Sequence, residues 1–358
     1  MKRNYGYDTY RGRSGFRTFL KVLAAALVIV LVVVVAGALW ITERYGVYSA
    51  DGVRLMLPWL DREPEPVSSV EVLPVVPSQP IVVVTPEVTV PADLQCVSLP
   101  REALYDGSAA GAVAAAGANG ALFDMKADDG SLGYVSSLDL AIKAKVSADD
   151  PALNAAIRAL NDTEGMYTVA RVSCFKDDKL SDAEKALNIL TNSGYRWTDP
   201  EGLHWSSPTS ESVRDYLTSV CLELAGLGFD EIVLDHAGYP TQGNLGYIKK
   251  GAAYDPDALD GVVTGFYQQV REALDGQYPD VKLSIVTTQA ALDGTDVLSG
   301  QTAGAVAGSA DRVWMKEAET AGAARLLAAA GMEDAGDKLV PLLDAPGPAD
   351  GSWAVWNW

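Results

Sequence analysis

The sequence predicts an α/β protein: a (β/α)8 TIM barrel preceded by an N-terminal transmembrane helix and a proline-rich stalk. Three observations support this prediction. Residues 22–41 carry no charge, proline recurs every few residues through 61–92, and eight short apolar runs alternate with helical segments after residue 93. The expected domains are a basic tail (1–21), a transmembrane helix (22–41), a stalk or linker (42–92) and a barrel domain (93–358).

The uncharged run VLAAALVIVLVVVVAGALWI fits a membrane-spanning helix. At about 1.5 Å per residue it covers the roughly 30 Å hydrocarbon core of a bilayer. Basic residues dominate the preceding tail, so the positive-inside rule keeps the N-terminus in the cytoplasm. We therefore expect a single-pass cell-membrane protein with an extracytoplasmic barrel. A cleaved signal peptide is the alternative, but the run exceeds the usual apolar core of about 7–15 residues.

The segment 61–92, DREPEPVSSVEVLPVVPSQPIVVVTPEVTVPA, shows no helical period. Such proline spacing is typical of an extended spacer, because proline limits both helix formation and strand pairing. The segment is expected to hold the barrel domain away from the membrane, within the bacterial cell envelope.

The acidic balance excludes some classes of partner. The net charge is −19 although the tail is basic, so the rest of the chain is strongly acidic and would repel nucleic acid. Three scattered cysteines (Cys96, Cys174 and Cys221) and two histidines make a zinc site improbable, and no disulfide framework is indicated. We expect no metal and no cofactor.

The strand–helix alternation predicts a parallel sheet covered by helices. A doubly wound open sheet is the alternative, but neither GxGxxG nor GxxxxGK[ST] follows the first apolar run. The connection between the fifth and sixth runs is rich in Gly and Ala, and the connection between the seventh and eighth is too short for a helix. The predicted strands lie at 95–99, 120–126, 166–175, 230–236, 281–288, 311–316, 338–344 and 353–358, and the predicted helices at 107–118, 150–161, 210–227, 256–276 and 317–331.

In a barrel of this kind the chemistry lies at the C-terminal ends of the strands. Strand alternation places Asp124 and Lys126 on one face, where they could form an acid–base pair at the mouth or a structural ion pair. Arg171 lies in an otherwise apolar strand and needs a partner, because an unpaired buried charge is costly. Asp124 on the neighbouring strand is the expected partner, in either a structural pair or a substrate clamp.

A long loop, 176–209, brings Tyr195, Trp197, His204 and Trp205 close together in sequence. Exposed aromatic rings on the upper loops of a barrel could stack against sugar rings. The alternative is a small core packed under the loop. Trp205 is a candidate substrate-binding residue on the first interpretation.

The fourth strand, within GFDEIVLDHAGYP, ends in two polar residues, Asp235 and His236. Alternation puts Asp235 on the face of Val233 and Glu231, and His236 on the opposite face. Asp235 is therefore expected to point into the barrel as a catalytic carboxylate. His236 is a substrate-binding candidate, or a hydrogen-bonded packing residue.

Hydrolysis of a glycosidic bond needs two carboxyl groups, one acting as acid and one as base or nucleophile. Besides Asp124 and Asp235, the strand ends supply Glu317 and Asp344, which are candidates for the acid. Glu317 also suits the first turn of a helix and Asp344 suits a turn. Trp356, at the end of the last strand, is a further substrate-binding candidate. No Ser-His-Asp order and no catalytic-cysteine signature competes.

Residues 119–240 resemble a family of putative glycoside hydrolase domains from bacterial (β/α)8 proteins, distantly related to the α-amylase-like barrels. Several separate motifs match in order. They comprise Asn119, Asp124 and Lys126; Ala170, Arg171, Phe175, Lys176 and Asp177; Trp205, Pro208, Asp215 and Tyr216; and 228–232 with Asp235 and Pro240. The family usually has Asp-Tyr-x-Arg-Phe-Pro after the fourth strand. Here His236, Ala237, Gly238 and Tyr239 lie between Asp235 and Pro240, so the arginine is absent.

Together with the expected membrane anchor at 22–41, the resemblance implies a membrane-anchored extracytoplasmic glycoside hydrolase acting on a polysaccharide or cell-wall glycan. In this interpretation Asp235 is nucleophile or base, Glu317 or Asp344 is the acid, and Asp124, Lys126 and Arg171 orient the sugar. Two other hypotheses remain open at this stage: a non-catalytic carbohydrate-binding barrel and a structural protein of the envelope. Fold alone does not decide among them.

Overall fold

The computed structural model describes residues 46–49, 52–55 and 91–356, in a chain that divides into two compact units, Met1–Val83 and Val84–Trp358. In the first unit, β1 (Gly46–Ser49) and β2 (Gly52–Leu55) form an antiparallel pair, an element that the assignment of 42–92 to a stalk did not include. The transmembrane segment expected at 22–41 lies outside the described residues. Among the helices that are described, none is long and apolar enough to cross a bilayer.

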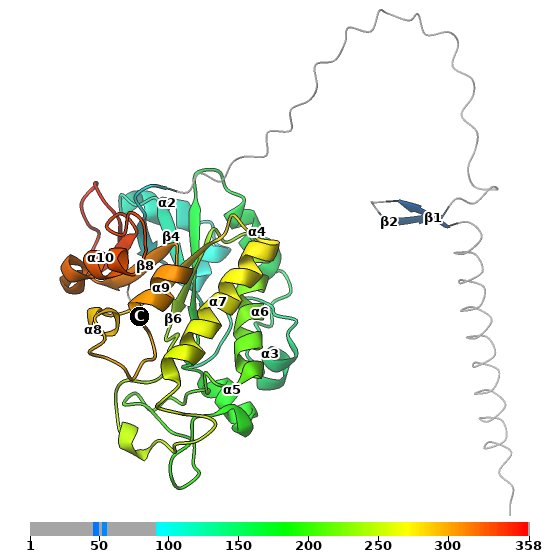
Figure 1. Ribbon diagram of the computed structural model, residues 1–358. Helices are drawn as coiled ribbons and strands as arrows, with labels where there is room; N and C mark the ends of the chain where they lie inside the picture. Colours follow the sequence, from blue (N-terminus) through cyan, green and yellow to red (C-terminus); the bar gives the residue numbers. More distant parts are fainter. Residues whose placement is uncertain (1–45, 50–51, 56–90, 357–358) are drawn as a thin grey trace, which may run out of the picture. The chain divides into compact units, whose positions relative to one another are not determined.

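The second unit contains a closed barrel of eight parallel strands, which confirms the barrel part of the predicted fold (Figure 1). The last strand pairs with both the first and the seventh strand of the barrel, so the sheet has no open edge, unlike the doubly wound alternative. All eight apolar runs form strands. They are β3 (Gln95–Ser98), β4 (Gly120–Lys126), β5 (Tyr167–Ser173), β6 (Glu231–Asp235), β7 (Lys282–Val286), β8 (Arg312–Lys316), β9 (Leu339–Leu343) and β10 (Trp353–Val355).

Helices cover the outside of the strands, as α6 and α7 show in Figure 1. The predicted helices correspond to α2 (Ala109–Ala115), α4 (Leu153–Asn161), α6 (Glu211–Gly226), α7 (Leu259–Gln277) and the pair η4 (Glu317–Glu319) and α10 (Thr320–Ala329). The side chain of Ser210 caps α6 by accepting a hydrogen bond from the backbone N–H of Val213. The shorter elements are η1 (Arg101–Leu104), α3 (Asp139–Ala144), α5 (Asp178–Ala183), η2 (Lys185–Leu187) and η3 (Leu245–Tyr247).

The Gly- and Ala-rich connection between β7 and β8 does form helices, α8 (Gln289–Leu292) and α9 (Ala303–Ser309). The side chain of Thr302 caps α9 by accepting a hydrogen bond from the N–H of Ala305 at 3.1 Å. Ala305 and Val306 are buried on this short helix. The cap and the packing compensate for the low helix propensity of its two glycines.

Apolar side chains fill the barrel, among them Leu122, Val169, Val233 and Trp314. The lower part of the barrel also holds the fully buried Glu231, which accepts hydrogen bonds from Tyr167 (2.9 Å) and Ser284 (2.6 Å) and pairs with Arg312. Because this charge pair is hydrogen-bonded within the barrel, it supports the fold rather than the chemistry. The polar residues at the opposite end of the barrel, where the strands have their C-terminal ends, are the candidates for a functional site.

Candidate active site

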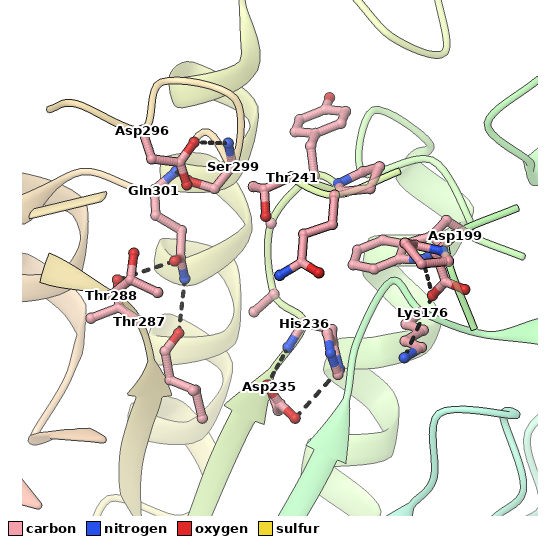
Figure 2. A pocket seen from close by; sticks show the side chains of 18 of the residues that line it. Lys176, Asp199, Asp235, His236, Thr241, Thr287, Thr288, Asp296, Ser299 and Gln301 are labelled. Carbon is pink, nitrogen blue, oxygen red and sulfur yellow. Dashed lines mark hydrogen bonds and ion pairs between the residues drawn. The ribbon is translucent and has the colours of Figure 1, made fainter. Parts of the chain in front are cut away.

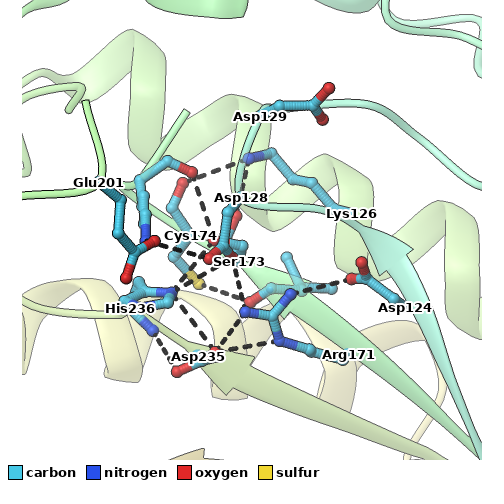
Figure 3. Close-up of polar contacts among 12 residues, drawn as sticks. Asp124, Lys126, Asp128, Asp129, Arg171, Ser173, Cys174, Glu201, Asp235 and His236 are labelled. Carbon is cyan, nitrogen blue, oxygen red and sulfur yellow. Dashed lines mark hydrogen bonds and ion pairs between the residues drawn. The ribbon is translucent and has the colours of Figure 1, made fainter. Parts of the chain in front are cut away.

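Arg171 organises the C-terminal ends of β4, β5 and β6. Its Nη1 lies 3.0 Å from Oδ1 of Asp124, its Nη2 lies 2.6 Å from Oδ1 of Asp128, and its Nε lies 3.0 Å from Oδ2 of Asp235 (Figure 3). The predicted ion pair between Arg171 and Asp124 is therefore confirmed. The guanidinium lies in the barrel mouth, because it contacts Asp235, whose side chain points inward from β6.

Three carboxylates around one guanidinium explain how Arg171 can be buried. Only 3% of its side chain is exposed, and an unpaired charge at this depth would be strongly destabilising. Burial acts to lower the pKa of Arg171, but the negative charges of Asp235, Asp124 and Asp128 outweigh it and raise the pKa. Arg171 is therefore a permanent cation at the centre of this cluster.

The acids around Arg171 differ in their ionisation. Burial raises the pKa of Asp124 above its usual value, and the opposing effect of Arg171 is too small to reverse the shift. Burial also acts to raise the pKa of Asp235, but the charges of His236 and Arg171 outweigh it and lower the pKa. The pKa of Asp128 is lowered too, because hydrogen bonds and charge from His236 and Arg171 exceed the effect of burial. Environments that push two carboxyl pKa values apart are typical of an acid and a base.

His236 does not point away from Asp235, and the prediction from strand alternation is wrong here. Its φ angle is +45°, a left-handed conformation that ends the extended strand and turns the side chain back toward Asp235. The ring Nδ1 lies 3.4 Å from Oδ2 of Asp235, 3.5 Å from Oδ1 of Asp128 and 3.3 Å from Oγ of Ser173. The backbone N–H of His236 also donates to Oδ1 of Asp235 at 2.8 Å, so this residue fixes the carboxylate from two directions.

Lys126 does not pair with Asp124, so the predicted acid–base pair is wrong. The register of β4 shifts between these two residues, which interrupts the simple alternation. The amine of Lys126 is fully buried and lies 2.8 Å from Oδ2 of Asp177 and 2.7 Å from the carbonyl oxygen of Ser173. Asp177 in turn caps α5 by accepting a hydrogen bond from Leu180. Lys126 thus stabilises the start of the loop after β5 through its contacts with Ser173 and Asp177.

Asp128 reaches the cluster through a tight turn after β4. The backbone N–H of Gly130 donates to the carbonyl oxygen of Ala127 at 2.8 Å, and Gly130 has a φ of +90°. A Cβ atom at Gly130 would lie 2.0 Å from Oδ1 of Asp177, so only glycine fits. The run Asp128–Asp129–Gly130 is typical of a turn, but nothing in the sequence indicates that this turn brings the Asp128 carboxylate to Arg171.

A cavity of about 250 Å³ opens beside Asp235 and His236 (Figure 2). Its opposite wall carries Asp296 and Gln301, from the loop between α8 and α9. A Cβ atom at Gly238 would lie 2.4 Å from the carbonyl oxygen of Ser299. The close contact between the loop after β6 and this wall therefore requires glycine at position 238. The other lining residues that bear on recognition are Lys176, Asp199, Glu201, Trp205, Thr287 and Thr288.

The cavity is acidic, although Lys176 contributes a cation. The side chain of Lys176 is only 4% exposed. Its amine lies 3.2 Å from Oδ2 of Asp128, 3.5 Å from Oδ2 of Asp199 and 2.6 Å from Oε2 of Glu201. Around this cavity the carboxylates outnumber the cations, so a polyanionic ligand would be repelled.

Two of the three predicted catalytic carboxylates lie apart from this cavity. Glu317, in η4, and Asp344, in the loop after β9, are exposed and are not among the residues that line the cavity. Trp356 lies near the cluster, because the guanidinium carbon of Arg171 is 5.4 Å from the centre of its ring. Trp356 also packs edge-on against Trp314 at 5.8 Å. The structure therefore brings together Asp124, Arg171, Asp235, His236 and Trp356.

The aromatic loop is mostly a small core rather than an exposed platform. Trp197 and Trp205 are buried, whereas Tyr195 is 75% exposed. Trp205 nevertheless lines the cavity, where its Nε1 donates to Asp199 at 3.1 Å and its ring meets the ring of His236 edge-on at 5.6 Å. His204 lies against Asp178. Trp205 therefore lines the cavity as a buried residue of a packed loop and not as an exposed ring.

Asp128, Asp235 and His236 each offer one side-chain atom of a kind that binds metal ions. Within residues 91–356, one ligand atom from each lies within 4.8 Å of the others. However, Arg171 donates hydrogen bonds to both carboxylates, and Lys176 pairs with Asp128. Their negative charge is already neutralised by fixed cations, so we assign these residues to the ion-pair cluster.

Comparison with known proteins is consistent with this geometry. A family described as "putative glycosyl hydrolase domain" matches residues 109–314, which include Asp124, Arg171 and Asp235. No curated protein matches the chain. Among solved structures, the glycoside hydrolase domain of PgaB (BpsB) from Bordetella bronchiseptica is similar, with 13% identity, a TM-score of 0.50, and coverage of 74% of this chain and 94% of that chain. This likeness supports the barrel fold.

Two further similar structures have lower TM-scores. A hypothetical protein from Ruminiclostridium thermocellum shares 24% identity with a TM-score of 0.45, over 53% of this chain and 96% of that chain. The glycoside hydrolase domain of PelA from Pseudomonas aeruginosa shares 14% identity with a TM-score of 0.39, over 70% of this chain and 83% of that chain.

Proposed function

Since the chain belongs to the family of putative glycosyl hydrolase domains, we propose that it hydrolyses glycosidic bonds with Asp235 as the catalytic carboxylate. One observation carries this proposal: Asp235 lines the cavity at the end of β6 and is held in its ionised form by Arg171 and His236. An ionised carboxylate at this position can attack the anomeric carbon or activate a water molecule.

The reaction also needs a proton donor for the departing glycosidic oxygen. Asp124 suits this role, because burial raises its pKa and so favours the protonated form that an acid requires. Asp124 and Asp235 contact different nitrogens of the same guanidinium, with Arg171 between them (Figure 3). We prefer Asp124 to Glu317 and Asp344, because Asp124 contacts Arg171 in the barrel mouth whereas the other two acids are exposed.

The acidic cavity and the acidic chain favour a glycan without a high density of negative charge. Trp205 in the cavity wall and Trp356, whose ring lies against the Arg171 guanidinium, place aromatic side chains near the proposed reaction centre. The hydroxyl groups of Thr287 and Thr288 and the side chain of Gln301 offer hydrogen-bonding groups to sugar hydroxyls. These features support a neutral polysaccharide or cell-wall glycan as substrate.

The proposed location is the outer side of the cell membrane. It is supported by the uncharged run at 22–41, the basic residues before it and the proline-rich segment after it. This placement would give the barrel access to polymeric glycans outside the cell, which suits a cavity at the exposed mouth of a barrel.

Product analysis tests the proposed function directly. The full chain, in detergent micelles, should release new reducing ends from at least one member of a panel of neutral polysaccharides and purified cell-wall glycans. Mass spectrometry would identify the products. Absence of product from every member, alongside measurable glycan binding, would instead support a non-catalytic carbohydrate-binding barrel. That second function is favoured by the ion pairs that already engage Asp124, Asp128 and Asp235.

Replacement of Asp124 by Asn should reveal its role as proton donor. We expect hydrolysis of the natural glycan to fall by about 10²- to 10⁴-fold. Aryl glycosides of the same sugar whose phenol leaving groups are strongly acidic should be cleaved almost as fast as by the wild type, because such groups depart without a proton.

The pH profile gives a second measure of Asp124. In the wild type, activity on the natural glycan should decrease as the pH rises through the raised pKa of Asp124, since the proton is then lost. Asp124→Asn should lack this decrease. Equal losses on both kinds of leaving group would contradict the assignment and favour a binding role for Asp124. Glu317→Gln, at an exposed position, is the matched control.

A further inference from the structure

A second cavity, of about 370 Å³, lies between two loops beyond the proposed catalytic cavity. None of its lining residues is charged, although the chain contains 47 acidic and 28 basic residues. A cavity without formal charge offers nothing to an ionic ligand, but its hydroxyl, amide and aromatic groups suit a neutral polyhydroxylated one. The lining residues are Thr191, Asn192, Ser193, Trp197, Thr198, Asn244 and Tyr247.

The two loops that form this cavity are joined by hydrogen bonds. The backbone N–H of Asn192 donates to the carbonyl oxygen of Tyr247 at 2.8 Å, and Nε1 of Trp197 donates to the carbonyl oxygen of Asn244 at 3.1 Å. Trp197 is buried and forms part of the floor. The cavity is therefore largely preformed, which reduces the entropic cost of binding a ligand.

A tyrosine at the edge of the cavity is available for stacking. Tyr247 is 64% exposed although its ring is large and mostly apolar, and Tyr195, on the opposing loop, is 75% exposed. The carbonyl oxygen of Tyr195 accepts a hydrogen bond from the N–H of Thr191 at 2.7 Å, which ties it to a lining residue. Exposed aromatic faces of this kind can pack against the C–H groups of a sugar ring.

The second cavity and the proposed catalytic cavity lie along the same two loops. Thr198 and Asn244 line the second cavity. Their close neighbours in the sequence, Asp199 and Gln242, line the catalytic cavity. Between them the loops meet closely, since a Cβ atom at Gly243 would lie 3.2 Å from Cδ of Pro200. The two cavities are therefore neighbours along these loops, and a glycan that occupies both must pass over the contact between Gly243 and Pro200.

We propose that the second cavity binds a neutral sugar unit, which stacks on Tyr247 and hydrogen-bonds to Asn192 and Asn244. The bound unit belongs to a glycan chain long enough to reach the catalytic cavity. The connection to the catalytic cavity rests on the proposed hydrolase function, whereas sugar binding by the second cavity does not. The site would select polymers over short oligosaccharides.

The test measures binding to the full chain carrying Asp235→Asn, so that hydrolysis does not consume the probe. Isothermal titration calorimetry with neutral hexasaccharides (cello-, xylo-, manno- and maltohexaose) and with the matching disaccharides gives affinities. Adding Tyr247→Ala should weaken the binding of at least one hexasaccharide by about tenfold, the effect of losing one aromatic stacking contact. Tyr247→Phe should retain the affinity, because it keeps the ring. Tyr105→Ala, at another exposed tyrosine, should change nothing.

Unchanged hexasaccharide affinity in Tyr247→Ala, or no binding of any of these hexasaccharides, would overturn the inference. Hydrolysis by the wild type together with unchanged affinity in Tyr247→Ala would overturn it while leaving the hydrolase proposal intact. Affinity that depends on Tyr247 in a protein that releases no product would support the second site and contradict only the hydrolase proposal.

Discussion

Asp235→Asn is expected to reduce kcat/KM for the cleaved glycan by about 10³-fold or more, with the fold preserved. Asparagine keeps the size of the side chain, and its carbonyl oxygen can still accept a hydrogen bond from Arg171. It cannot supply the negative charge that a nucleophile or base needs. Arg171 retains Asp124 and Asp128 as partners, so it is not left unpaired. Release of reducing ends measures the activity, and calorimetric unfolding measures the stability.

Three matched substitutions make this result specific. Asp215→Asn removes an exposed acid on α6 that contacts Gln269, and should leave activity unchanged. Glu317→Gln and Asp344→Asn remove the acids that the sequence suggested as proton donors, and should also have little effect. Turnover by Asp235→Asn close to that of the wild type would contradict its catalytic role. A large loss of activity in Glu317→Gln or Asp344→Asn would indicate that the substituted residue, and not Asp124, is the proton donor.

Arg171→Met is expected to destabilise the protein by about 3–5 kcal/mol at neutral pH, because it leaves three partly buried carboxylates without their shared cation. Methionine fills much of the space of the arginine stem, so the loss should reflect charge more than volume. Chemical denaturation at several pH values measures the change. Lys179→Met, which removes a largely exposed pair with Asp129, should cost at most about 1 kcal/mol.

The pH dependence should change sign in Arg171→Met. In the wild type the pKa values of Asp128 and Asp235 are lowered by folding, so their stabilising effect is present above about pH 4 and is lost as the pH falls through the lowered values. Without Arg171, burial is opposed only by His236 and, at Asp128, by Lys176, so the pKa values of these acids in the folded state should rise above their wild-type values. Acidification from neutral pH should then protonate them and recover part of the lost stability. A variant whose stability loss is the same at pH 5 and pH 7 would argue against this account.

Strand periodicity accounts for most of what could be predicted about the site. Asp235 was expected on the inward face of its strand and Asp124 was expected to pair with Arg171, and the ion pairs through Arg171 bear this out. Such predictions succeed because side-chain alternation follows from the covalent geometry of an extended chain. The positions of the eight strands follow from the same kind of local pattern.

The predictions that failed involve breaks in that local pattern. The register shift in β4 separates Lys126 from Asp124, and the left-handed conformation of His236 turns its ring toward Asp235. Neither feature is visible in the order of residue types. Trp197 and Trp205 could be exposed or buried as far as the sequence shows, and the packing of the loop buries both.

By itself, the sequence determined the barrel, the inward placement of Asp235 and the need of Arg171 for an acidic partner. Only the tertiary structure decided that Asp128 joins the cluster, that Lys126 pairs with Asp177, and that a second, uncharged cavity lies beside Tyr247. The physical reason is the range of the interactions. Alternation along a strand depends on neighbouring residues, whereas turns, bulges and cavities depend on contacts between segments far apart in the chain.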